Sequence, residues 1–333
     1  MEFSQRRLAG LIVLVVSVSF LVLFWTVDVA TLRQLSNFHP VSLLGVVFLI
    51  AIGIYFDALR LIRLSAVSGE KVPLSLALRV VFGNYFMALL TPGAAGGAVI
   101  QVLFLKRAGM PTGKATVVVL IRTILSILFL LVCLPVVFFY DPQILPWFDR
   151  DGIVQAALLL VGLTIAGMLA MRTRMADRLA VIIVKRLPVR WRFRLMKVYC
   201  DMRGALALMS SSPCAMGRAL LESAVSLLAL YAMVPVLFAG MGSEMDWIQA
   251  MGRMIFLNLL LYFAPTPGGA GVAEGLFLGS FQAFFPLGTV GIVAVAWRIF
   301  AEYLPACVGG YFTVKTFGMQ KVSEKQPGRE DEL

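Results

Sequence analysis

The chain has 333 residues, of which 60% are hydrophobic and only 14% are charged, and its mean hydropathy is +0.91. Soluble globular domains average roughly 45–50% apolar and about 25% charged residues, so a single water-facing core cannot bury this much apolar surface. The net charge of +11 would favour nucleic acid as the partner of a soluble protein, whereas in a membrane protein basic residues sort to the cytoplasmic side. The composition therefore predicts an integral membrane protein, with the lipid bilayer and no nucleic acid as its partner.

Long apolar runs recur along the chain, and about 20 apolar residues suffice for a helix to cross a bilayer. Residues 1–27 are interpreted as a retained first span, because the apolar part is too long for a secretory signal and no small-residue cleavage site follows it. The six predicted full spans are 8–27, 41–59, 116–140, 153–171, 218–241 and 287–314. Two further apolar stretches, 74–105 and 248–285, are interrupted in the middle by proline and glycine.

The positions of the basic residues predict the topology. Suppose that the N-terminus is cytoplasmic and that both broken stretches dip into the membrane and return. The cytoplasmic segments then carry 23 of the 29 Lys and Arg residues, and the outer loops carry only Arg33 and Arg150. Full crossing of the broken stretches would instead place Lys106, Arg107 and Lys114 outside. The positive-inside rule therefore favours N- and C-termini that are both cytoplasmic.

We interpret residues 1–314 as one transmembrane domain with a first half, 1–140, and a second half, 153–314. A linker over 172–217 is basic and amphipathic, which is typical of helices that lie along an anionic leaflet. The tail 315–333 is polar and is predicted to be disordered and cytoplasmic.

The two broken stretches resemble each other at an offset of 175 residues. The matched pairs are Thr91 and Thr266, Pro92 and Pro267, Gly93 and Gly268, Ala95 and Ala270, Gly96 and Gly271, and Ala98 and Ala273. In each half an asparagine precedes the break and an arginine lies in the span after it. Because the first stretch enters from the cytoplasm and the second from outside, the halves are predicted to be inverted-topology repeats, the architecture of many secondary transporters.

Proline removes a backbone donor and glycine permits tight turns, so both breaks are expected to leave irregular backbone. Such backbone survives in a membrane only when it is buried in protein or lines a wet cavity. The half-helices that follow Pro92 and Pro267 would aim their positive N-terminal ends at the break, which suits an anion. Close small-residue packing is the alternative interpretation; it accounts for the glycines but not for the repeated proline.

Charged groups inside apolar segments are costly and are candidates for function. Arg298 and Glu302 are four residues apart and are expected to pair, while Glu274 could pair with Arg298 or Arg122. Arg122 and Arg298 could flank one anionic headgroup, since a guanidinium is a planar clamp for phosphate. The predicted substrate-binding residues are Asn84, Arg122, Asn258, Glu274, Arg298 and Glu302; the predicted breaks are Thr91, Pro92, Gly93, Gly96, Gly97, Thr266, Pro267, Gly268, Gly269 and Gly271.

Other charged residues near the span ends have a plainer interpretation. Arg79, Glu222 and Arg253 could either extend to the interface or take part in function. Another three, Asp57, Arg60 and Arg63, are expected to be interfacial. One histidine and four scattered cysteines predict no metal site, and no Gly-rich phosphate loop for ATP is present, so no cofactor is expected.

The stretch from Asn84 to Arg107 together with Arg122, and the stretch Pro265 to Gly275 followed by Arg298, are similar to the lysylphosphatidylglycerol synthase transmembrane, or flippase-like, family. The resemblance covers nearly the whole chain. It implies lipid translocation between the leaflets of a bacterial cytoplasmic membrane by an all-α, polytopic fold. In bifunctional members a cytosolic aminoacyl-transferase domain follows, whereas here a stand-alone membrane domain is expected.

The leading hypothesis is a non-enzymatic translocase for an anionic phospholipid or a lipid-linked headgroup. A membrane enzyme would need a nucleophile, a base or a metal cluster, and the sequence has no such set. A scaffold or accessory subunit for a separate lipid or envelope-glycan synthetase is the alternative, and a partner synthetase and a homo-oligomer both stay open. The expected fold is all-α, with six full spans and two broken re-entrant helical hairpins.

Overall fold

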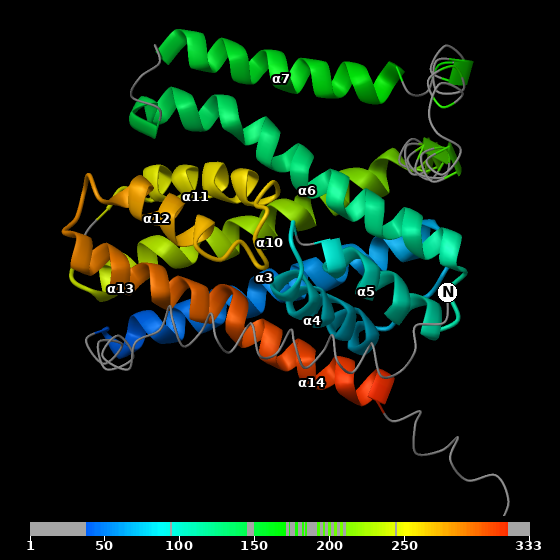
Figure 1. Cartoon of the computed structure of the whole chain (residues 1–333), viewed down its shortest axis with the longest axis horizontal. Coiled ribbons are helices and arrows are strands. Elements are labelled where there is room, and N and C mark those ends of the chain that lie inside the picture. Colours follow the sequence, from blue (N-terminus) through cyan, green and yellow to red (C-terminus); the bar gives the residue numbers. More distant parts are fainter. Residues whose placement is uncertain are drawn as a thin grey trace, which may run out of the picture.

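The computed structural model describes residues 38–93, 95–144, 150–170, 211–243 and 245–318, and only isolated residues between 173 and 208. The regular elements of this part of the chain are all helices (Figure 1). The predicted span 8–27, most of the predicted linker 172–217, and the tail from residue 319 lie outside the described residues.

Four helices are long and apolar enough to cross a membrane. They are α3 (Pro40–Val67), α6 (Thr112–Tyr140), α10 (Pro213–Gly240) and a last unit made of α13 (Leu287–Arg298), the π-helical turn η3 (Ile299–Tyr303) and α14 (Leu304–Gly318). The helix α7 (Arg150–Ala170) lies in the predicted span 153–171, and its apolar part, Val154–Ala166, is shorter than these four. These findings confirm an all-α membrane protein. Several ends differ from the prediction: α3 runs eight residues past 59, α14 continues to Gly318, and α6 and α10 begin earlier, at Thr112 and Pro213.

Both interrupted stretches are pairs of shorter helices, as predicted. The first pair is α4 (Leu74–Leu90) and α5 (Ala95–Arg107), and the second is α11 (Trp247–Leu261) and α12 (Val272–Phe281). Positive φ angles at Gly93, Gly268, Gly269 and Gly271 give the breaks their turns, and glycine tolerates this region of φ best.

Gly96 and Gly97, which were predicted as part of the first break, instead lie in the first turn of α5 and are buried. A Cβ at Gly96 would lie 2.6 Å from the Thr91 side chain, and one at Gly97 would overlap the Asn84 side chain. These two glycines therefore allow α5 to pack closely against α4.

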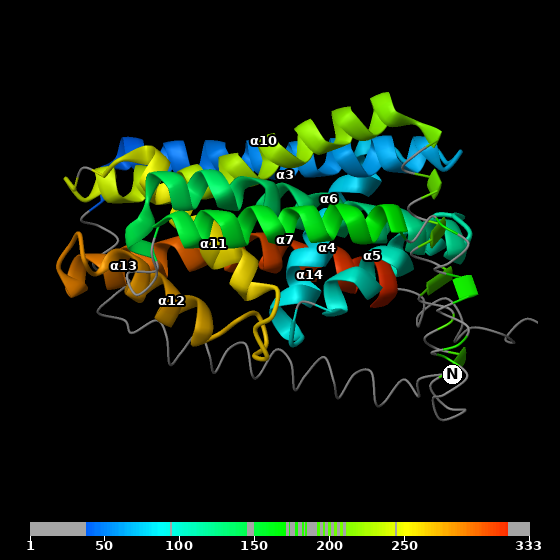
Figure 2. The ribbon, with the colours of Figure 1, turned by 90° about the horizontal axis from the view of Figure 1, so that it is seen from above.

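The two breaks touch each other. Pro92 and Pro267 form an isolated antiparallel bridge, and the Gly93 N–H donates to the Ala264 carbonyl at 3.1 Å. In Figures 1 and 2 the α4–α5 pair extends from this contact toward one end of the bundle, and the α11–α12 pair extends toward the other. The matched motifs of the two halves thus meet in the middle of the described fold.

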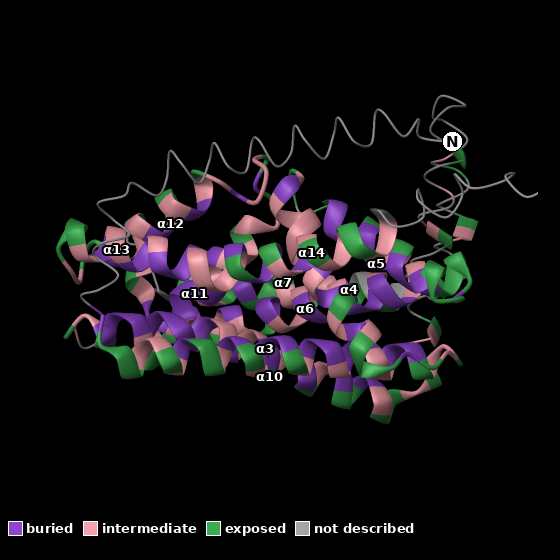
Figure 3. Cartoon of the chain, turned by 90° about the horizontal axis from the view of Figure 1, so that it is seen from below, coloured by how far each residue is buried: buried purple, intermediate pink, exposed green. Residues whose placement is uncertain are grey.

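Helices α3 and α10 pack side by side along their lengths. Ser226 donates to the Gly53 carbonyl at 2.7 Å, and Gly53 leaves room for the Leu230 side chain. Figure 3 shows exposed residues along the outer side of this pair and buried residues toward the other helices. Large apolar side chains such as Leu44 and Phe48 lie on the exposed side, which suits contact with hydrocarbon.

The last helix crosses α4 at a glycine. A Cβ at Gly309 would overlap the Phe82 carbonyl oxygen, which belongs to the backbone and cannot swing aside. Gly309→Ala should therefore force α14 away from α4, at a cost of about 1–3 kcal/mol for an overpacked contact. We expect a lower thermal unfolding midpoint of the protein in detergent.

Gly291→Ala is the matched control, since it lies in α13 of the same membrane-crossing unit and an added Cβ would meet no described atom within 4 Å. Alanine there should leave the midpoint unchanged or raise it slightly, because alanine favours helix over glycine. Equal midpoints for the two variants would contradict the close α4–α14 contact.

Candidate functional site

A cavity of about 480 Å³ opens beside the contact between the two breaks. Its walls include Gly93 and Gly268 from the breaks, and polar side chains contributed by six helices and the π-helical turn. These polar residues include Asp57 and Arg60 (α3), Asn84 (α4), Gln101 (α5), Arg122 (α6), Asn258 (α11) and Glu302 (η3). The cavity therefore combines irregular backbone with ionisable groups in an otherwise apolar bundle.

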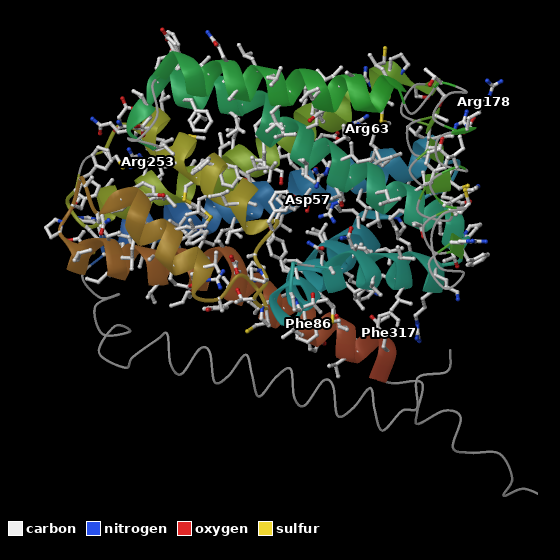
Figure 4. All side chains as sticks on the ribbon, turned by 45° about the horizontal axis from the view of Figure 1, so that its top comes forward. Asp57, Arg63, Phe86, Arg178, Arg253 and Phe317 are labelled. Carbon is white, nitrogen blue, oxygen red and sulfur yellow. The ribbon has the colours of Figure 1, made fainter. Side chains whose placement is uncertain are left out.

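Asp57 occupies the middle of this region, within the bundle (Figure 4). Its carboxylate forms ion pairs with Arg60, one turn along the same helix, and with Arg122 on α6. Arg122 binds in a bidentate manner, with Nη2 on Oδ2 and Nε donating to Oδ1 at 3.1 Å. All three side chains are less than a tenth exposed. Because bidentate pairs fix both partners, α3 and α6 are held in register here.

Most of the remaining donors of the two arginines also have partners, but Arg60 Nε is buried without a hydrogen-bond partner among the described residues. Arg60 Nη1 donates to Ser126 Oγ at 2.7 Å and to Ser223 Oγ at 2.8 Å, which adds α10 to the network. Arg122 Nη1 donates to Gln101 Oε1.

Gln101 carries the network into the first broken pair. Its Nε2 donates to Asn84 Oδ1 at 2.7 Å, and so links α5 to α4. The network therefore ties the first broken pair to three long helices.

This cluster has a charge surplus, because one carboxylate balances only one of its two guanidiniums. Burial makes an uncompensated charge expensive, and the cost falls if a counter-charge enters. The wall that contains Arg60 and Arg122 is therefore suited to an anion.

A second cluster surrounds Arg298, whose side chain is 1% exposed. Its Nε lies 2.9 Å from Glu274 Oε1, its Nη1 pairs with Glu302 Oε2, and its Nη2 donates to the Gly268 carbonyl at 3.0 Å. The predicted Arg298–Glu302 pair is confirmed, and of the two partners considered for Glu274 the structure selects Arg298. Two carboxylates and one guanidinium leave this cluster with a negative surplus.

The described residues that line the cavity include Glu302 but neither Arg298 nor Glu274. Arg298 instead lies behind the second break and supports it through the Gly268 carbonyl. The π-helical turn begins directly after Arg298 and contains Glu302, and π-bulges of this kind are frequent at functional sites.

Protein groups occupy part of each half-helix N-terminus. Glu274 Oε2 accepts the Gly271 N–H at 2.7 Å at the start of α12, and Thr91 Oγ1 accepts the Gly96 N–H at 2.8 Å at the start of α5. The sequence predicted that these ends would suit an external anion. At α12 the Glu274 carboxylate already accepts this hydrogen bond. The guanidinium groups of the first cluster are therefore better placed to donate hydrogen bonds to an external anion.

The two asparagines that precede the breaks both line the cavity. Asn84 accepts from Gln101, and Asn258 Nδ2 donates to the Met254 carbonyl at 2.9 Å. Of the six predicted substrate-binding residues, the cavity thus brings together Asn84, Arg122, Asn258 and Glu302.

The expectation that Asp57 and Arg60 are interfacial is wrong. Both are buried, 6% and 4% exposed, because α3 continues as an apolar helix to Val67. Leu61 and Leu64 are fully buried, and this apolar continuation past Arg60 is the sequence signal that could have placed the pair inside.

Two other charged residues, Arg253 and Glu222, form ion pairs within the protein and do not extend toward solvent. Arg253 is 4% exposed and donates to Asp141 at 2.6 Å and 3.0 Å, with its guanidinium 4.4 Å from the Phe284 ring centroid. Glu222 accepts from Arg63 Nε at 2.9 Å and 3.0 Å. Within the described residues, no three His, Cys, Asp or Glu side chains gather in a group that could hold a metal ion.

Comparison with known families gives one match over most of the chain. Residues 8–309 match the family described as lysylphosphatidylglycerol synthase TM region. No curated protein matches the sequence at a significant level.

The shared carboxylate predicts an asymmetry between two substitutions. Asp57→Asn leaves two buried guanidiniums without a counter-charge, and breaking a buried ion pair costs about 3–5 kcal/mol. We expect a markedly lower thermal unfolding midpoint in detergent. Glu70→Gln is the control, because its pair with Lys114 is exposed and such pairs contribute about 0–1 kcal/mol. Equal midpoints for the two variants would contradict the role assigned to Asp57.

Proposed function

Because the chain belongs to the lysylphosphatidylglycerol synthase TM family, we propose that it moves a lipid with an anionic, phosphate-containing headgroup between the leaflets of a membrane. The lipid is a phospholipid or a lipid-linked headgroup. The observation that carries the proposal is the 480 Å³ cavity, which has a buried two-arginine cluster in its wall and lies where the two breaks meet.

The size and chemistry of the cavity suit a headgroup. Small-molecule sites occupy roughly 300–1,000 Å³, which matches a phosphate with a small polar substituent. Arg60 and Arg122 supply N–H donors and one surplus positive charge. A phosphate would neutralise the surplus, while Asp57 keeps both guanidiniums in position.

The part of the lining formed by Glu302 has a different role. The Arg298 cluster, to which Glu302 belongs, has a negative surplus, which repels a second phosphate and directs the anion toward Arg122. Arg298 acts on the second break through the Gly268 carbonyl, and we assign it a positioning role. Asn84 and Asn258 place amide groups at the cavity on either side of the contact between the breaks.

The proposed topology follows the charge distribution. The two broken pairs are re-entrant hairpins that enter from opposite sides of the membrane, and their breaks lie near its midplane. With 23 of the 29 Lys and Arg residues on one side, that side is the cytoplasm, and both termini lie there. The membrane is the cytoplasmic membrane of a bacterium.

We infer transport and not catalysis. The groups at the cavity form two ion-pair clusters that hold positions and charges, and no bond of the lipid needs to break for it to change leaflets. The energetic problem is to carry a charged headgroup across hydrocarbon. A cavity with buried arginines lowers that barrier by replacing water around the phosphate.

Arg122→Gln tests the proposal while it keeps the charges of the cluster balanced. The substitution leaves Asp57 paired with Arg60, so the cluster becomes neutral, and it removes the hydrogen bonds of the Arg122 guanidinium to Asp57 and Gln101. Hydrogen bonds to charged groups contribute about 1.5–3 kcal/mol, so the rate should fall on the order of tenfold or more. The measurement is the flipping of fluorescent phosphatidylglycerol in liposomes that contain the purified protein.

Lys114→Gln is the control, because it removes an exposed positive charge that pairs with Glu70 and takes no part in the network, and its rate should equal that of the wild type. Undiminished flipping by folded Arg122→Gln would overturn the role of the first cluster. If the folded wild-type protein flips no lipid by itself, the result supports an accessory subunit of a separate synthetase instead.

A further inference from the structure

A second cavity, of about 350 Å³, is strongly basic. Arg79, Arg107 and Lys315 line it together with Phe312 and Thr316, and the described lining contains no carboxylate. The three cations come from α4, α5 and α14, so the fold gathers them from distant parts of the chain. We propose that this basic pocket binds the phosphate of an anionic phospholipid in the adjacent leaflet.

The geometry keeps the positive charges close to one another and accessible. All three cationic residues are exposed, so an incoming headgroup can reach them. The Arg107 guanidinium lies 5.5 Å from the Phe317 ring centroid, and Lys315 Nζ lies 5.6 Å from that of Tyr311. These contacts orient the cations. A cleft lined by one sign of charge concentrates counter-ions, so this one attracts an anion.

The other lining groups favour a lipid phosphate. Guanidinium and ammonium donors with the Thr316 hydroxyl can surround phosphate oxygens. Phe312 adds an apolar surface of the kind that a glycerol backbone can contact. The volume suits a headgroup and is too small for a whole acyl chain.

The position in the fold separates this pocket from the central cavity. Gln101 in the middle of α5 lines the central cavity, and Arg107 at the end of the same helix lines the basic pocket. At 1.5 Å per residue the two points lie about 9 Å apart along the helix. Figures 1 and 2 place the ends of α5 and α14 at the same end of the bundle, and Figure 4 shows Phe317 there.

The charge distribution assigns this end to the cytoplasmic side, where anionic lipids attract basic groups. The pocket could thus hold a lipid at the membrane surface, outside the proposed transport path. The proposal does not need the central cavity to transport anything, because binding here can be measured without flipping.

The test is binding of phosphatidylglycerol in neutral detergent, measured by native mass spectrometry on full-length protein that carries Arg122→Gln, so that binding in the central cavity does not obscure binding at the basic pocket. Arg79→Gln combined with Lys315→Gln should weaken binding about tenfold, since each basic residue near a membrane surface contributes appreciably to anionic-lipid affinity. The matched control combines Lys106→Gln with Arg218→Gln. It removes two exposed positive charges that do not line the pocket and should change binding less than about twofold.

Equal weakening in both double variants would show a diffuse surface-charge effect and overturn the proposal, as would unchanged binding in both. If the double variant fails to fold, Arg79→Gln alone should still weaken binding more than Lys106→Gln alone. Competition with inorganic phosphate separates the two sources of the anion. Resistance to millimolar phosphate supports a lipid headgroup, whereas full displacement shows a site for soluble phosphate and overturns the assignment to lipid.

Discussion

The shared ion pair of Asp57 with Arg60 and Arg122 is the constraint on which the rest of the structure depends. Three charged side chains are buried at the centre of an apolar bundle, and both guanidiniums depend on the one carboxylate for a counter-charge. Their hydrogen bonds reach Ser223 on α10 and Gln101 on α5, so one ion-pair cluster connects four helices. The same cluster leaves one positive charge in excess beside a cavity, and this excess links stability to the proposed function.

The second constraint is the contact between the breaks. Pro92 and Pro267 form an isolated bridge. Arg298 donates a hydrogen bond to the Gly268 carbonyl, and its guanidinium pairs with two carboxylates. Irregular backbone has polar groups that are unfavourable in lipid when they are unpaired, and here each break contacts the break in the other half of the molecule. The two ion clusters have opposite surplus charge, so an anion that enters between them meets an attractive wall and a repulsive one.

Local patterns are sufficient to predict the described helices and the place of both breaks, although Gly96 and Gly97 belong to α5, because apolar runs and the Thr-Pro-Gly repeat are continuous in sequence. The pair between Arg298 and Glu302 was also predictable, since helical spacing alone brings them together. The partners of the first cluster were not predictable. In the sequence Arg60 and Arg63 look like basic residues at the end of a span, and their partners Ser126, Ser223 and Glu222 come from other helices. Arg253 similarly depends on Asp141, 112 residues away, which only tertiary packing brings close.

The central claim is that an anionic headgroup occupies the cavity between the two clusters. The most direct measurement is an electron cryomicroscopy structure of the protein in nanodiscs that contain phosphatidylglycerol. The account predicts density for a headgroup phosphate against Arg60 and Arg122, beside the contact between Pro92 and Pro267. A cavity that holds only water or acyl chain, with every headgroup confined to the two leaflets, would contradict it.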